Sequence, residues 1–70
     1  MLDPHPFTSG DEILEIRMMA LFGGDPDPFP NTAAPDLEIR LQALFAGEPD
    51  PAPNTSGDTI LEERLAAVRR

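Results

Sequence analysis

Leu61-Glu62-Glu63-Arg64-Leu65-Ala66-Ala67-Val68 is one of three copies of a short pattern in this chain of 70 residues. The other two copies are Leu37-Glu38-Ile39-Arg40-Leu41-Gln42-Ala43-Leu44 and Leu14-Glu15-Ile16-Arg17-Met18-Met19-Ala20-Leu21. The shared pattern is Leu-Glu-x-Arg-(Leu/Met)-x-Ala-(Leu/Val), and successive copies begin 23 and then 24 residues apart. Self-similarity of this kind indicates that one structural unit is repeated along the chain.

Each copy predicts a short amphipathic helix. At about 100° per residue, the first, fifth and eighth positions of the pattern fall within a stripe about 60° wide, and the arginine lies on one flank of that stripe. Helical motifs are predicted over residues 10–22, 34–46 and 58–70, which makes the fold class all-α. Ser9 and Glu12 are the predicted capping box of the first helix, and Gly47 is the predicted left-handed cap after the second.

The segments between the motifs are rich in proline and aspartate. They comprise a lead-in over residues 1–9 and spacers over residues 23–33 and 47–57, where alternating prolines favour extended backbone. A stretched spacer of this kind would reach on the order of 40 Å. Because helices of about 12 residues are marginal alone in water, the sequence predicts three separate helices, largely disordered when unbound.

Composition excludes several classes of function. Thirteen acidic and five basic residues give a net charge of −8, which argues against binding of nucleic acid or of anionic membrane surfaces. No apolar run approaches the roughly 20 residues of a membrane span, so direct membrane insertion is not expected. The chain has no cysteine and one histidine, His5, which is expected to be inert. Neither a catalytic constellation nor a metal or cofactor site is expected, so the chain is not predicted to be an enzyme.

Two self-contained alternatives compete with the array of separate helices. The first is a three-helix bundle with the apolar stripes as its core. Against it, core-facing helices usually show an apolar face wider than about 100°, and bundle connections usually run about 2–8 residues. The second is a coiled coil, for which each stretch is short, at less than two heptads.

The repeated pattern resembles the type 1 MIT-interacting motif of ESCRT-III subunits, (Asp/Glu)-x-x-Leu-x-x-Arg-Leu-x-x-Leu-(Lys/Arg). The third copy fits best, with Asp58 and Arg69 at its two ends and Val68 for the last leucine. The second copy has Ala34 and Phe45 at the acidic and basic ends. The first copy has Met18 for the second leucine and a phenylalanine for the terminal base.

The resemblance implies that each helix docks between two helices of an MIT domain, with its leucines in pockets and its arginine paired with acidic groups. It also implies recruitment of the ESCRT AAA ATPase or a related factor, in the cytoplasm and, through partners, at endosomes or the midbody. A helical ligand for another groove-bearing protein is a further alternative. The partner-binding residues implied are Leu14, Arg17, Met18, Leu21, Leu37, Arg40, Leu41, Leu44, Asp58, Leu61, Arg64, Leu65, Val68 and Arg69.

Overall fold

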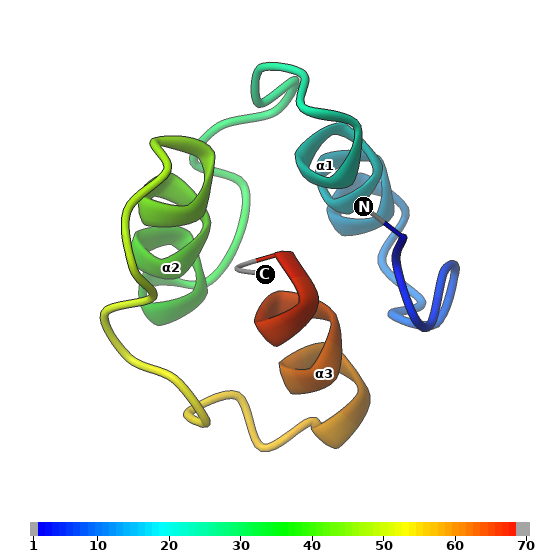
Figure 1. Cartoon of the computed structure of the whole chain (residues 1–70), viewed down its shortest axis with the longest axis vertical. Helices are drawn as coiled ribbons and strands as arrows, with labels where there is room; N and C mark the ends of the chain where they lie inside the picture. Colours follow the sequence, from blue (N-terminus) through cyan, green and yellow to red (C-terminus); the bar gives the residue numbers. More distant parts are fainter. Residues whose placement is uncertain (1, 69–70) are drawn as a thin grey trace.

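Three helices account for the regular secondary structure of the computed structural model, which describes residues 2–68 (Figure 1). They are α1 (Glu12–Gly23), α2 (Pro35–Phe45) and α3 (Thr59–Val68). The described residues contain no strand, so the chain is all-helical over this range, as predicted. Each helix begins one or two residues after the start of its predicted motif.

The ends of the helices follow from local residues. Asp11, and not Ser9, is the N-cap of α1, because its carboxylate accepts the N–H groups of Ile13 and Leu14. The Ser9 hydroxyl accepts only the N–H of Asp11. Gly47, with φ of 78°, follows the C-terminal end of α2 in the left-handed conformation that the sequence predicts.

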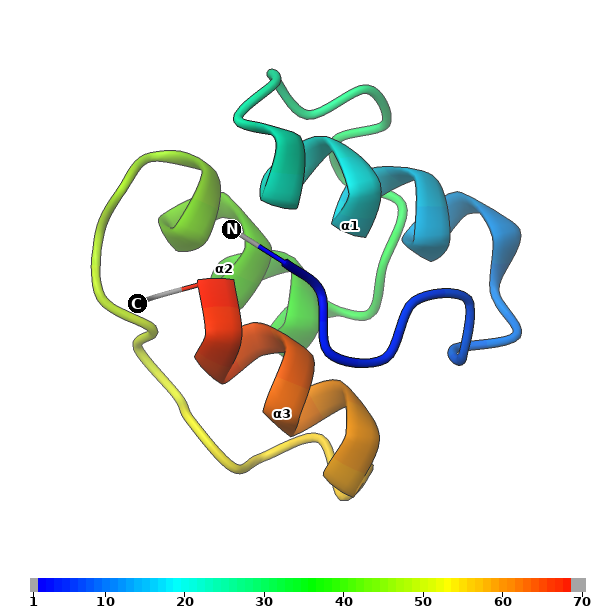
Figure 2. The ribbon, with the colours of Figure 1, turned by 45° about the vertical axis from the view of Figure 1, so that its right-hand side comes forward.

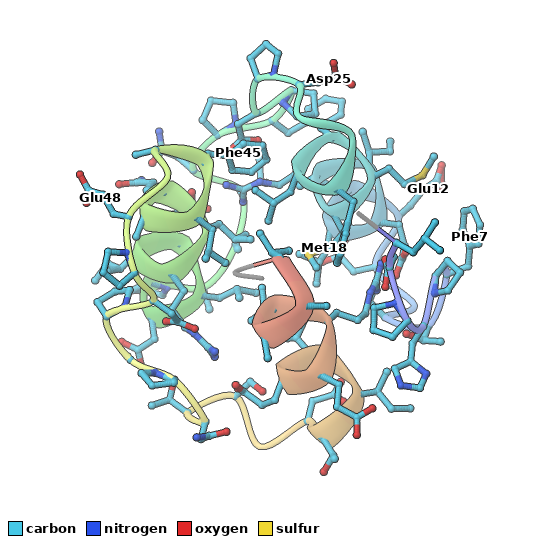
Figure 3. All side chains as sticks on the ribbon, in the orientation of Figure 1. Phe7, Glu12, Met18, Asp25, Phe45 and Glu48 are labelled. Carbon is cyan, nitrogen blue, oxygen red and sulfur yellow. The ribbon has the colours of Figure 1, made fainter. Side chains whose placement is uncertain are left out.

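The core lies between the three helices, and each helix contributes two buried side chains to it. Met18, Leu41 and Leu65 occupy the same position of the repeated pattern and have no exposed surface. Figures 1 and 2 show α1, α2 and α3 arranged around a common centre, and Met18 points towards this centre in Figure 3, whereas Glu12 and Glu48 lie on the outside. The complete buried apolar set is Leu14, Met18, Leu41, Leu44, Leu61 and Leu65.

The prediction of separate helices on extended linkers is therefore wrong. Residues 2–68 form one packed body, with dimensions of 23 × 22 × 21 Å and a radius of gyration of 10.6 Å. Instead of lying disordered, the spacers fold back over the helices. The narrow apolar stripes argued against the alternative of a three-helix bundle, because a core-facing helix usually has a wider apolar face. These stripes suffice because the arginine on the flank of each is also buried, which widens the buried face of every helix.

Candidate functional site

Each arginine of the repeated pattern lies at the centre of a buried ionic cluster. The Arg17 side chain has no exposed surface and donates to two carboxylates. Its Nε and Nη2 atoms lie 3.1 and 2.7 Å from the Asp27 oxygens, and its Nη1 and Nη2 atoms each lie 2.8 Å from a Glu38 oxygen. Asp27 comes from the spacer after α1 and Glu38 comes from α2, so the Arg17 cluster joins two repeats.

The same arrangement occurs twice more. Arg40 Nη2 lies 2.7 Å from both Asp50 Oδ2 and Glu62 Oε1. Asp50 belongs to the next spacer and Glu62 to α3. Arg64 lies 2.6 Å from Asp3 and 2.8 Å from Glu15, which belong to the first residues of the chain and to α1. We call these the Arg17, Arg40 and Arg64 clusters. Each arginine pairs with the following repeat, and the Arg64 cluster closes the series by joining the last repeat to the first.

Backbone N–H groups complete the coordination of the glutamates. Glu38 accepts hydrogen bonds from the N–H groups of Asn31 and Ala33, at 3.0 and 2.9 Å. The equivalent donors are the N–H groups of Phe7 and Ser9 to Glu15 and those of Asn54 and Ser56 to Glu62. Each cluster holds two carboxylates and one guanidinium, so these backbone dipoles stabilise the surplus negative charge.

A turn of fixed sequence, Asp-Pro-x-Pro-(Phe/Asn)-Thr, supplies the aspartate of each cluster. It begins at Asp3, Asp27 and Asp50. Each of these aspartates also accepts the N–H of the residue two positions later, at 3.0–3.1 Å. The threonine hydroxyl donates to the carbonyl three residues before it, at 2.8–2.9 Å. The prolines have no N–H group that would need a partner here.

The clusters shift the pKa values of their glutamates. Hydrogen bonds from Arg64 lower the pKa of Glu15 from 4.5 to about 2, against the opposing effect of burial. Hydrogen bonds from Arg17 likewise lower the pKa of Glu38 to about 2, and those from Arg40 hold the pKa of Glu62 well below its usual range. Within residues 2–68, no buried side-chain nitrogen or oxygen lacks a hydrogen-bond partner.

The structure places most of the predicted partner-binding residues inside the molecule. Arg17, Arg40 and Arg64 are 0–1% exposed. Six of the apolar residues form the core, and Leu21, Leu37 and Val68 pack against it. Asp58 is exposed and accepts the N–H of Leu61 near the start of α3. Arg69 lies outside the described residues. The expectation that the arginines pair with acidic groups of another protein differs from what is found, because carboxylates of the chain itself occupy them.

Sequence reasoning missed the six carboxylates of the clusters: Asp3, Asp27, Asp50, Glu15, Glu38 and Glu62. Two signals were available for finding them. The glutamate two positions before each arginine is constant in all three copies, and the Asp-Pro-x-Pro turn is present in the lead-in as well as in both spacers. The hydrogen bond between His5 Nε2 and the Glu63 carboxylate of α3 was likewise not predicted.

Comparison with known proteins does not assign the chain to a family. No family model matches it, and no curated protein or solved structure gives a significant match. Across residues 2–68, the helices are too short and too polar for any of them to cross a membrane.

Proposed function

We propose that the repeated pattern serves to hold the chain together as a self-contained three-helix domain with a structural role. One observation carries this proposal: each motif arginine is buried and bound on both sides by carboxylates of the same chain. A buried charge is costly unless it is paired and hydrogen-bonded, and here all three arginines meet that condition without a partner protein.

Thermal unfolding followed by circular dichroism tests this proposal. A self-contained domain of this size loses its helicity in one cooperative transition that coincides with the loss of tertiary structure. A gradual, non-cooperative loss of helicity in the isolated chain would contradict it. Helical signal that appears only when a partner is added would contradict it as well.

Binding to MIT-type helical domains is the second candidate function. It is favoured by the third copy of the pattern, which has the acidic residue, the arginine and the apolar residues of that motif at the matching spacings. Arg64 and Leu65 are 1% and 0% exposed, so α3 has to leave the core before it binds. The affinity of the whole chain is then lowered in proportion to the fraction of molecules that are open.

In this second candidate, the chain recruits the ESCRT AAA ATPase or a related factor in the cytoplasm, at endosomes or at the midbody. It has no enzymatic role of its own. Its three motifs would become available on opening of the bundle, which makes it a multivalent ligand.

Glu15→Arg separates the two candidates without altering any residue of the MIT-type pattern. It places a cation against Arg64 and opens the contact between α1 and α3, whereas Glu12→Arg makes the same change of charge at an exposed position of α1. The two variants, the parent chain and a peptide of residues 56–70 are titrated with an MIT domain.

If the chain is an MIT ligand that must open, the peptide binds most tightly. Glu15→Arg then binds more tightly than the parent chain, and Glu12→Arg matches the parent. If the peptide does not bind, the MIT candidate is wrong and the structural role stands. Equal binding by the peptide and the parent chain would show that no opening is needed.

A further inference from the structure

Within residues 2–68, hydrogen bonds and ion pairs between side chains hold the last repeat against the first. We call residues 3–23, 27–45 and 50–68 units 1, 2 and 3. Short connections at residues 24–26 and 46–49 join unit 1 to unit 2 and unit 2 to unit 3. The seam is the contact between units 3 and 1, which is formed by the Arg64 cluster and the His5–Glu63 hydrogen bond. In Figure 2 the first residues of the chain run between α1 and α3 at this seam.

The seam reproduces the geometry of the two linked boundaries. The shortest arginine–aspartate distance is 2.6 Å at the seam and 2.7 Å at both linked boundaries. The arginine–glutamate distance is 2.8 Å at the seam, and 2.8 and 2.7 Å at the others. Recognition of one unit by the next therefore does not depend on a peptide that connects them.

The site that holds unit 3 has two chemically different sides. On one side, Asp3 and Glu15 accept the guanidinium of Arg64. On the other side, Arg40 donates to Asp50 and Glu62 of unit 3. An occupant of this site therefore needs an arginine for the first side and a pair of carboxylates for the second, with an apolar residue such as Leu65 between them to fill the core.

We propose that this site accepts unit 3 of a second copy of this chain, so that two copies exchange α3 and form a dimer. Each copy of unit 3 then meets the same partners as in the monomer, and no contact is lost on exchange. The change of conformation is confined to residues 46–49, where Gly47, with φ of 78°, turns the chain back after α2. Exchange of an identical element across a short hinge is a low-cost route to dimers.

Two charge-reversed variants of the full chain test the exchange. Arg64→Glu places three acidic groups at its own seam, and Glu15→Arg places two cations there, so neither variant closes on itself. In a mixture, the Arg64 of the Glu15→Arg chain meets the unaltered Asp3 and Glu15 of the Arg64→Glu chain, which restores one native seam. The second seam pairs the introduced glutamate with the introduced arginine.

The expected result is a one-to-one complex with twice the mass of one chain, seen by light scattering of the mixture, together with helicity above the average of the separate variants. Glu12→Arg is the matched control, because it carries the same change of charge on α1 outside the cluster. It is expected to form no one-to-one complex with Arg64→Glu. The chain carrying both Glu15→Arg and Arg64→Glu is expected to close on itself as a monomer.

A mixture that keeps the mass of one chain and the average helicity up to millimolar concentration would overturn the proposal. A second measurement uses the unaltered protein. Isotopically labelled and unlabelled chains are opened together in acid at high concentration and returned to neutral pH. Dimers that contain one chain of each kind support the exchange, and a purely monomeric product contradicts it.

Discussion

Arg64 Nη1 lies 2.8 Å from Glu15 Oε2, although 49 residues separate the two in the sequence. This pair closes the molecule, because it connects α3 to α1 in the same way that Arg17 connects α1 to α2. Stability is consequently distributed over three equivalent ionic contacts and one shared apolar core.

The pKa values of the cluster glutamates predict loss of stability in acid. The pKa of Glu15 falls from 4.5 to about 2 on folding, and that of Glu38 falls equally far. The stabilisation from a lowered pKa is present above pH 4.5 and is lost as the pH falls towards 2. Each carboxylate contributes on the order of 3 kcal/mol to the free energy of unfolding. Urea unfolding between neutral pH and pH 2 measures the loss.

Two glutamine substitutions test whether the cluster glutamates cause this sensitivity to acid. Glu15→Gln is expected to lower stability at neutral pH and to make the pH dependence shallower. Glu48→Gln, at an exposed position outside the clusters, is expected to leave the curve unchanged. An equally steep acid transition in Glu15→Gln and the parent chain would show that the clusters do not cause it.

Removal of one cluster arginine is expected to destabilise the whole domain. Arg40→Ala removes the guanidinium that binds the buried Asp50 and the partly buried Glu62, at a cost of roughly 3–5 kcal/mol. That is a large part of the roughly 5–15 kcal/mol expected for a small domain. Arg40→Lys keeps the charge but loses the planar fork, so its stability should lie between those of the parent and Arg40→Ala in urea unfolding.

Substitution of Ile39, the neighbour of Arg40 in the sequence, is the matched control. Ile39 is 55% exposed on the outer side of α2, so Ile39→Ala is expected to change the free energy of unfolding by about 0.5 kcal/mol or less. Comparable losses for Ile39→Ala and Arg40→Ala would contradict a dominant role for the Arg40 cluster.

Phe7→Asn is expected to stabilise the protein. Phe7 has a φ of 64°, close to the values of 66° and 65° at its counterparts Asn31 and Asn54. Asparagine adopts this left-handed conformation more readily than phenylalanine. Because Phe7 is 72% exposed, its replacement removes little packing, and a gain of about 1 kcal/mol is expected in thermal or urea unfolding.

The reverse exchange serves as the control. Asn54→Phe should lower stability by a similar amount, because phenylalanine adopts the left-handed conformation of this turn less readily than asparagine does. The backbone N–H of residue 54 still donates to Glu62 in this variant, so the cluster itself is kept. A loss of stability in Phe7→Asn would instead indicate that the phenylalanine ring makes a stabilising contact.

Ala34→Asp is expected to stabilise α2. Ala34 is the N-cap of this helix and makes no side-chain hydrogen bond to it, whereas Asp11 and Asp58 hydrogen-bond the first N–H groups of α1 and α3. A new aspartate cap is expected to add about 1 kcal/mol to the free energy of unfolding. Ala46→Asp introduces the same residue at the other end of α2, where the helix dipole is unfavourable, and should not stabilise it.

The helices could be predicted from the sequence because their signals are local. The leucine spacing places the starts of α1, α2 and α3 within about two residues, in line with the usual uncertainty of helix boundaries. Pro35 and Gly47 mark the two ends of α2, and the predicted end of the third helix lies outside the described residues. The apolar residues of each stripe, which the resemblance implied would contact a partner, lie in or against the core of the chain itself. Their contact proved to be with one another, as in the bundle alternative.

The clusters and the closed arrangement were harder to predict because they depend on contacts between distant segments. Arginine is seldom fully buried in proteins, so the positions of Arg17, Arg40 and Arg64 beside an apolar stripe indicate groups directed at a partner. The stripes then looked too narrow for a core. The aspartates of the proline-rich turns were not predicted to bind the arginines, since periodicity within a helix carries no information about Asp27 or Asp50.

The Arg64 cluster also fixes how many repeats this molecule can hold. In a solenoid, each repeat contacts its neighbours along an open line, and repeats can be added at either end. Here the interface is heterologous, since an arginine on one side meets two carboxylates on the other, and its rotation closes after three units in the manner of a cyclic trimer. Within residues 2–68, each cluster arginine already binds two carboxylates. A fourth unit inserted into the chain would have to break one of these three contacts, so duplication of the repeat is expected to break this architecture and not to extend it.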